Sequence, residues 1–74
     1  MDAESKSLVK NLGKNIKVLR ETRSLTQAQL AKKAGVALET IRRIEKGADS
    51  WLKTLLKIAD ALEVELSVLF TPDE

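Results

Sequence analysis

The sequence predicts an all-α protein with five helices. Three observations indicate this class: apolar residues recur every three or four positions, Leu, Ala, Lys and Glu dominate, and the single proline, Pro72, lies near the end. Alternating runs of β-branched residues are missing. The 74 residues, 43 % of them apolar, suffice for one domain over residues 1–74 with a small core.

The first helix is expected at about residues 5–22. An apolar stripe at intervals of four, four and three residues marks it: Leu8, Leu12, Ile16 and Leu19. Gly13 lies within this helix and destabilises it by about 1 kcal/mol relative to alanine. The close approach of another segment would explain this glycine, and only a structure tests that explanation.

The second and third helices are expected at residues 27–34 and 37–46. Thr26 and Gln29 have the spacing of a capping box at the start of the second helix. Gly35 predicts a left-handed stop at its end, and another glycine follows the third helix. Two short helices joined by a turn that contains glycine predict a helix-turn-helix.

The last two helices are expected at residues 50–62 and 65–70. Either Asp49 or Ser50 can cap the first of them. Its buried stripe is predicted to comprise Leu52, Leu55, Leu56, Ala59 and Leu62. The final segment, "EVELSVLF", alternates enough to fit a strand as well, but no partner strand exists elsewhere, so a short helix is the better interpretation.

Charge is distributed unevenly along the chain. Residues 1–47 hold eleven Lys/Arg against five Asp/Glu, and residues 48–74 hold two against six. This asymmetry favours a basic face for a polyanion, although chance in a short chain explains it equally well.

Missing residue types narrow the functions further. The chain has no cysteine and no histidine, and therefore lacks disulfides, thiolates, the commonest general base and the commonest zinc ligands. We expect no enzyme, no metal and no cofactor. No apolar run approaches a membrane span and no signal peptide is recognisable, which favours a cytoplasmic protein without a membrane partner. We expect no small-molecule effector, because no effector domain is recognisable in these 74 residues.

The third expected helix has two distinct faces. One arc carries Ala37, Ile41, Ile44 and Glu45, and the other carries Leu38, Glu39, Arg42, Arg43 and Lys46. The second arc is either a solvated surface with a Glu39–Arg43 pair or a surface for nucleic acid. The short helix, the apolar residue at its projecting start and the basic charge favour the second interpretation, because a major groove about 12 Å wide accepts such a helix.

The stretches "LGKNIKVLRETRSLTQAQLAKKAGVALETIRRIEKG" and "TLLKIADALEVELSVLF" resemble the helix-turn-helix domain of phage Cro and repressor proteins, the XRE-type group. The resemblance covers Leu12 to Phe70. Five motifs occur in order: L-R in the first helix, T-Q-x-x-L-A, G-V at the turn, I-x-x-I-E-x-G, and T-L-x-K-I-A-x-A-L. Two departures are the loop "ADSW", which lacks the usual proline, and Ser24, which stands where glycine is common.

The resemblance implies a five-helix domain with its third helix in the DNA major groove. The implied base-facing residues are Ala37, Leu38, Glu39 and Arg43. Gln27 matches a position that meets the DNA backbone, and Arg20 and Glu45 match a pair that joins the first helix to the end of the third.

The chemistry of these side chains suits the same roles. Arg43 can donate two hydrogen bonds to a guanine, worth about 1–3 kcal/mol of discrimination. Leu38 and Ala37 can pack on a thymine methyl group. Glu39 can accept from cytosine or hold Arg43 in place. The expected phosphate contacts, besides Gln27, are Thr40, Arg42 and Lys46.

We therefore expect a transcriptional regulator that binds double-stranded DNA in a sequence-specific manner, as a homodimer on a palindromic operator. The predicted dimer surface is Trp51, Leu66, Val68, Leu69 and Phe70, although these residues can instead close the monomer core. Trp51 has three possible places: core, DNA or partner. The alternative function is an antitoxin-type module that binds a toxin or another protein as well as DNA.

Overall fold

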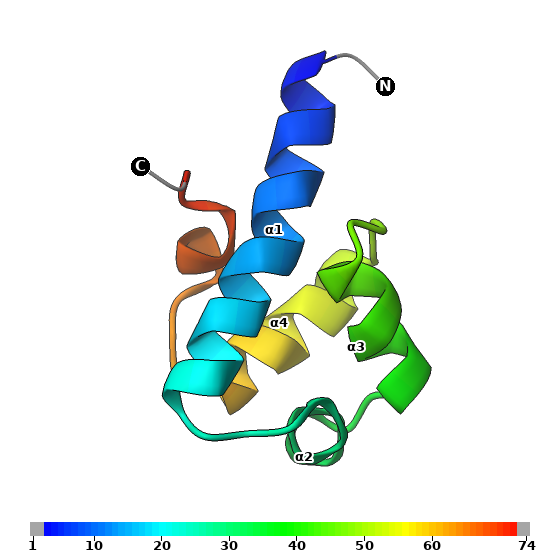
Figure 1. Cartoon of the computed structure of the whole chain (residues 1–74), viewed down its shortest axis with the longest axis vertical. Helices are drawn as coiled ribbons and strands as arrows, with labels where there is room; N and C mark the ends of the chain where they lie inside the picture. The colour runs from blue at the N-terminus through cyan, green and yellow to red at the C-terminus, as the bar shows by residue number, and fades with distance from the viewer. Residues whose placement is uncertain (1–2, 73–74) are drawn as a thin grey trace.

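The computed structural model describes the backbone of residues 3–72 and the side chains of residues 11–72. This part of the chain is helical and contains no strand, which confirms the all-α class (Figure 1). The elements are α1 (Ala3–Thr22), α2 (Gln27–Ala34), α3 (Leu38–Glu45), α4 (Leu52–Ala61) and η1 (Leu66–Phe70). The fifth segment is a 3-10 helix rather than an α-helix, so the expected count of five α-helices is corrected to four.

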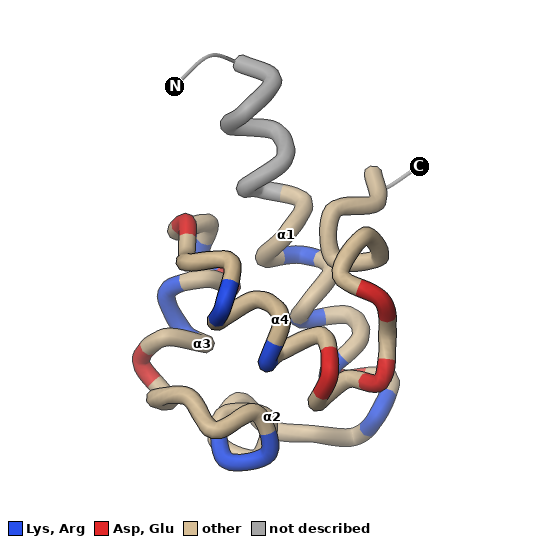
Figure 2. The backbone as a smooth tube through the Cα atoms, turned by 180° about the vertical axis from the view of Figure 1, so that it is seen from behind, with Lys and Arg blue, Asp and Glu red and all other residues tan. Residues whose placement is uncertain are grey.

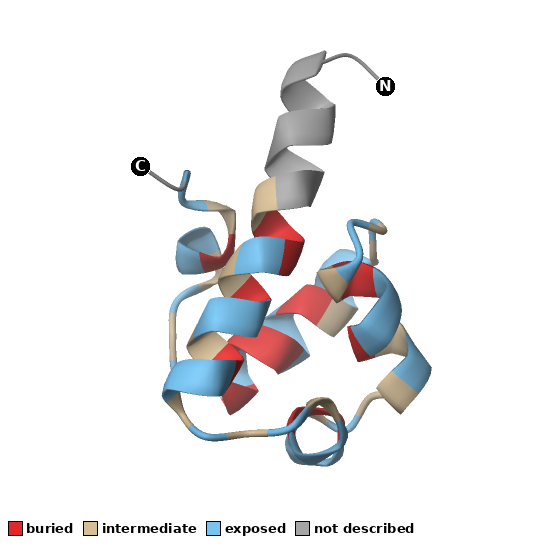
Figure 3. Ribbon diagram, in the orientation of Figure 1, coloured by how far each residue is buried: buried red, intermediate tan, exposed pale blue. Residues whose placement is uncertain are grey.

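The helices surround one core. α1 packs against η1 on one side and against α3 on the other (Figure 1). α2 packs against both α3 and α4. Every element contributes buried apolar residues, which are coloured red in Figure 3. These are Leu12, Ile16, Leu30, Ala31, Ile41, Ile44, Leu55, Ile58, Ala59, Ala61, Leu62 and Leu69. The predicted stripe of α1 is therefore confirmed at Leu12 and Ile16, whereas Leu8 lies outside the described side chains.

The buried face of α4 differs from the predicted one. Leu52 and Leu56 are exposed, and Ile58 takes a core position instead. Leu55, Ile58 and their neighbours at positions 59 and 62 share one arc, and Leu56 lies about 100° from Leu55 around the helix axis. Because the leucines of α4 are three and four residues apart, the sequence allows two overlapping apolar stripes. Packing against α2 and η1 buries the stripe that contains Leu55 and Ile58.

α2 has the boundaries that the sequence predicts. The backbone N–H of Gln29 donates to Thr26 Oγ1 at 3.0 Å, and the N–H of Thr26 donates to Gln29 Oε1 at 2.8 Å. Gly35 ends the helix at φ +71°, in the left-handed region. Ser24, which replaces a common glycine, also takes a positive φ of 58°.

The start of α4 was predicted wrongly. The N-cap is Trp51, whose side chain makes no capping hydrogen bond, and neither Asp49 nor Ser50 caps the helix. The Asp49 carboxylate instead accepts from the N–H of Ser50 at 2.7 Å. The helix therefore begins two residues later than expected, at Leu52.

Gly13 lies where α1 crosses α3. A Cβ atom built at this position would lie 3.2 Å from both Cα and the carbonyl oxygen of Glu45, and closer still to the carbonyl oxygen of Ile44. The explanation by close approach is therefore confirmed. The glycine lets the backbone of α1 touch the end of α3, and so helps to fix the position of α3.

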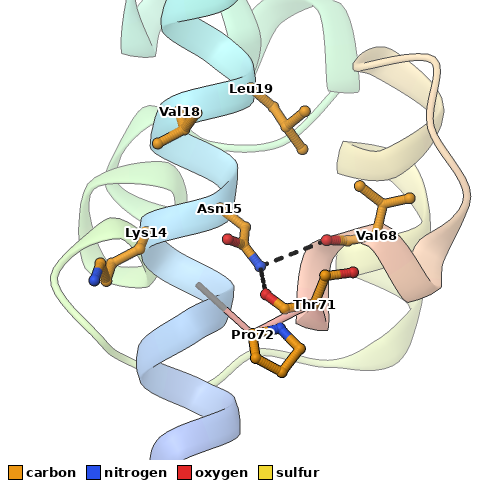
Figure 4. A pocket seen from close by; sticks show the side chains of 7 residues that line it. All are labelled: Lys14, Asn15, Val18, Leu19, Val68, Thr71 and Pro72. Atoms are coloured by element: carbon orange, nitrogen blue, oxygen red, sulfur yellow. Dashed lines mark hydrogen bonds between the residues drawn. The ribbon is translucent and has the colours of Figure 1, made fainter. Parts of the chain in front are cut away.

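Asn15 fastens the C-terminal segment to α1, a role that sequence analysis missed. Its Nδ2 donates to the carbonyl oxygens of Leu69 at 2.9 Å and Thr71 at 2.7 Å, with Val68 further away at 3.5 Å (Figure 4). Because these acceptors lie more than 50 residues away in the sequence, no local pattern indicates them.

Candidate nucleic-acid interface

α3 presents a polar surface on a buried support. Ile41 and Ile44 are buried, while Glu39, Arg42 and Arg43 are exposed. Ala37 is the exposed N-cap and makes no side-chain capping bond. The prediction of two faces is thus confirmed for most positions of this helix.

Leu38 and Ala37 differ from their predicted arcs. Leu38 is half-buried and packs against the core, so that only part of its side chain faces solvent. Ala37 had been placed on the inner arc, but it is exposed because it precedes the helix in an extended conformation. Both remain at the projecting N-terminal end of α3.

A buried ion pair fixes the end of α3 to α1. Arg20 Nε donates to Glu45 Oε2 at 2.8 Å and Arg20 Nη2 to Oε1 at 3.0 Å, the two-pronged geometry that the guanidinium favours. The side chains are only 10 % and 4 % exposed. A third bond, from Arg20 Nη1 to the carbonyl oxygen of Leu25, reaches the turn before α2. The expected pair is confirmed.

The electrostatics of this pair follow from its hydrogen bonds. The hydrogen bond to Glu45 raises the pKa of Arg20, burial lowers it, and the charge of Glu45 raises it further, with a net upward direction. The two hydrogen bonds to Glu45 compensate the burial of the Arg20 guanidinium.

Gln27 joins the same network. Its Nε2 donates to Glu45 Oε1 at 3.1 Å, so the first residue of α2 is tied to the last residue of α3. The N–H groups of a first helical turn have no acceptor within the helix, and Thr26 takes up only that of Gln29. The start of α2 therefore has backbone N–H groups without a helical acceptor, next to the Gln27 side chain that is bonded to Glu45.

We call the concavity beside this network the basic hollow. It has a volume of about 390 Å³. Its lining comprises Lys17, Arg20, Gln27, Arg42, Glu45 and Lys46. Arg20 and Glu45 neutralise each other at its floor, which leaves the three exposed cations Lys17, Arg42 and Lys46 around it. Sequence analysis missed Lys17, although its position three residues before Arg20 on α1 was a usable signal.

A second concavity of about 260 Å³, the α4 hollow, lies on the other flank of α3. Its lining comprises Thr40, Arg43, Ile44, Asp49, Ser50, Trp51 and Thr54. The structure thus separates two adjacent arginines, with Arg42 on the flank of α1 and Arg43 on the flank of α4.

Glu39 pairs with a different arginine from the one considered in the sequence. Its Oε2 lies 3.8 Å from Arg42 Nη1, an i,i+3 pair, and both side chains are more than half exposed. The alternative in which Glu39 holds Arg43 is therefore wrong. Within residues 11–72 the Arg43 guanidinium has no ion pair, and it is free to meet a ligand. Figure 2 shows charged residues of both signs along this part of the backbone.

The predicted dimer surface is corrected in part. Leu69 is fully buried in the core, and Leu66 and Phe70 are half-buried against it. These three close the monomer core because η1 packs against α1 and α4. Trp51 and Val68 are exposed, as required of surface residues.

No group of three or more Asp or Glu side chains among the described residues could hold a metal ion. None of their helices has the length and apolar character that a membrane crossing requires.

A family model described as helix-turn-helix, HTH_3, matches residues 16–69 of this chain. The chain belongs to the HTH_3 helix-turn-helix family. The matched residues include α2, α3 and α4 and both hollows described above. An uncharacterised HTH-type transcriptional regulator of Methanocaldococcus jannaschii is 45 % identical over 56 residues, which cover 74 % of this chain and 85 % of the relative.

Two solved structures share the fold. The restriction-modification controller protein C.AhdI from Aeromonas hydrophila has a TM-score of 0.80 and 30 % identity, over 84 % of this chain and 96 % of that one. An HTH_3 family transcriptional regulator from Vibrio cholerae has a TM-score of 0.79 and 31 % identity, over 85 % of this chain but only 36 % of its own. Together with the fold, these matches show a DNA-binding transcriptional regulator.

Proposed function

We propose that this HTH_3 protein binds a palindromic double-stranded operator as a homodimer, with α3 of each copy in the major groove. The observation that carries the proposal is the surface of α3, which has a hollow of different chemistry on each flank; Arg43 lines one of them and has no ion pair among residues 11–72. A helix in the major groove has base edges in front of it and a phosphate backbone on each side, which matches this arrangement.

Base recognition is assigned to the N-terminal and central part of α3. Arg43 is exposed and unpaired, and its guanidinium can donate to O6 and N7 of one guanine. Ala37 and the exposed part of Leu38 offer methyl groups to thymine. Glu39 is neutralised in part by Arg42 in the free protein, and it accepts from cytosine or repels a phosphate when Arg42 turns to DNA.

Phosphate binding is assigned to the basic hollow. Arg42, Lys46 and Lys17 surround it, and the first N–H groups of α2 lie beside Gln27. We add Lys17 to the phosphate contacts expected from the sequence. The side-chain amide of Gln27 is bonded to Glu45, so we assign the phosphate contact at Gln27 to its position at the start of α2. Thr40, on the other flank, suits the opposite backbone.

The mechanism depends on rigid presentation. Gly13, Arg20, Glu45 and Gln27 hold α1, α2 and α3 in one relative position, so the protein does not have to order its recognition surface on binding. Phosphate contacts supply affinity that depends on salt, and base contacts supply the choice of sequence.

The decisive experiment is selection of bound duplexes from a random library, with the natural chain and with Arg43→Ala. We expect a palindrome whose half-sites each lose one guanine preference in the variant. The matched control is Arg42→Ala, an exposed arginine one residue away. It should weaken binding to all selected duplexes alike and reduce the salt slope by about 1.

Three outcomes would contradict the proposal. Equal loss of binding to every sequence in Arg43→Ala would make that arginine a phosphate contact. A preference for RNA or single strands would exclude the major-groove geometry. Selected sites without two-fold symmetry would exclude the homodimer.

A further inference from the structure

Trp51, Leu52 and Leu56 form an exposed apolar patch at the start of α4, which we call the α4 patch. Their exposed fractions are 84 %, 60 % and 49 %. Leu52 and Leu56 are four residues apart and therefore lie on the same side of the helix. The patch holds three of the five large hydrophobic side chains exposed among the described residues.

The monomer gives no reason for a tryptophan at this position. Trp51 is the N-cap of α4, where Ser, Thr, Asp or Asn would accept a hydrogen bond from the helix, and the indole makes no such bond. It does not fill the core either, because it is the most exposed large hydrophobic residue described. A residue that serves neither capping nor packing is best explained by a partner.

We propose that the α4 patch is the surface through which two copies of this chain meet about a two-fold axis, and that DNA completes their association. The inference rests on the proposed function, because it says where the homodimer forms. Trp51 lines the same hollow as Arg43 and Thr40, so the patch begins where the α3 surface ends. An axis beside this edge leaves both α3 helices facing one duplex.

The other exposed apolar site does not meet this requirement. A groove of about 570 Å³ between α1 and η1 includes the exposed Val18 and Val68 (Figure 4). η1, which contributes Val68 to the groove, lies on the opposite side of α1 from α3 (Figure 1). Two copies joined there would hold their α3 surfaces further apart than two copies joined beside α3.

Charge around the α4 patch favours a second copy. Asp49 precedes the patch in the connection to α4, Lys53, Lys57 and Asp60 follow within the helix, and all four are exposed. A two-fold contact places residues away from the axis opposite different residues of the partner, so a border with charges of both signs can pair with its own copy. The surface of α3, with an excess of cations, would repel its own copy.

The size of the α4 patch explains why DNA is needed. The three side chains expose roughly 400 Å² per copy, about half of what each partner buries in a standard stable interface. We therefore expect a weak dimer in free solution and cooperative binding to two half-sites, since the duplex raises the effective concentration of the second copy.

Fluorescence of the intact chain tests this directly. Trp51 is the only tryptophan and the chain has no tyrosine, so the emission reports on this one side chain. The probes are a duplex recovered by selection and the same duplex with one half-site scrambled. We expect the emission to shift to the blue on the two-half-site duplex and to stay near its free value on the other.

A matched pair of variants locates the interface. Leu52→Glu and Val18→Glu each place a charge at a position that is 60 % exposed, one in the α4 patch and one in the groove beside η1. Leu52→Glu should lower the affinity for two half-sites by about tenfold or more and leave the single half-site affinity within about twofold. Val18→Glu should change neither. If Leu52→Glu does not fold by circular dichroism, Leu56→Glu replaces it.

Several results would overturn the inference. A full emission shift on the scrambled duplex would mean that the indole contacts DNA. Loss of cooperativity in Val18→Glu alone would place the interface beside η1, and a tightly co-purified second protein on the patch would make the partner a different chain. Failure of the proposed function is distinguishable: no duplex would be selected, while sedimentation at high concentration would still show a dimer that Leu52→Glu abolishes.

Discussion

Replacing Gly13 by alanine should destabilise the protein, although helix propensity alone predicts the opposite. In an isolated helix the change is worth about 1 kcal/mol in favour of alanine. Here the new methyl group would meet the carbonyl oxygen of Ile44 and lie 3.2 Å from two backbone atoms of Glu45. Backbone atoms cannot rotate away, so α1 and α3 must separate before the methyl group fits.

The two contributions can be compared. Extra volume in a well-packed interface costs about 1–3 kcal/mol, occasionally more, and a backbone obstacle belongs at the upper end of this range. Separation of the helices also strains the Arg20–Glu45 bonds, which cross the same interface. After subtracting the gain in propensity, we expect a net loss of about 2 kcal/mol, or about 10 °C in Tm for a domain of this size.

Thermal and urea unfolding followed by circular dichroism measure this loss. The control is the pair Lys17→Ala and Lys17→Gly, at an exposed position of the same helix, which isolates propensity. We expect alanine to be the more stable by about 1 kcal/mol at that position, and the less stable at Gly13. A Tm for Gly13→Ala at or above that of the natural chain would refute the argument that the α1–α3 approach requires glycine.

Three further changes test the same structure. Arg20→Ala should cost about 3–5 kcal/mol because it leaves the Glu45 carboxylate buried without its partner, and a loss below 1 kcal/mol in urea unfolding would show that the pair is solvated. Trp51→Ser should raise the free energy of unfolding by about 0.5–1 kcal/mol, and with it Tm, because serine caps α4; a lower Tm would show that the indole packs within the monomer. Asn15→Ala should cost about 1–2 kcal/mol and speed hydrogen exchange of the backbone around η1, and unchanged exchange there would mean that its bonds do not hold η1 to α1.

Local signals in the sequence predicted what local forces determine. Both ends of α2 were predicted correctly, because the capping box and Gly35 each act on backbone groups only a few residues away. The predicted start of α4 was wrong because a residue type that can cap a helix does not always do so. Asp49 and Ser50 have side chains suited to capping, but the Asp49 carboxylate accepts from the N–H of Ser50. The connection therefore extends to Trp51, which is the N-cap. Motif order, through resemblance, also predicted the Arg20–Glu45 pair, although the residues are 25 positions apart.

Burial in the C-terminal part of the chain could not be predicted from sequence patterns alone. Leu69 and Leu56 look equivalent as apolar residues on amphipathic segments, yet one is buried and the other is half exposed. The difference depends on how η1 is held between α1 and α4, to which Asn15 contributes from the far end of the sequence. The composition of a segment does not say which of its apolar residues another segment will cover.

The sequence by itself determined the helical class, the helix-turn-helix and the family, because periodicity, caps and motif spacing act along the chain. It also indicated most of the residues on the exposed arc of α3, although Leu38 is half-buried and Ala37 is exposed. Only the tertiary structure decided that Arg42 and Arg43 lie beside different hollows, that Gly13 is required by an approaching backbone, and that Trp51 is left in solvent beside α3. These properties depend on distances between segments remote in sequence, which packing sets.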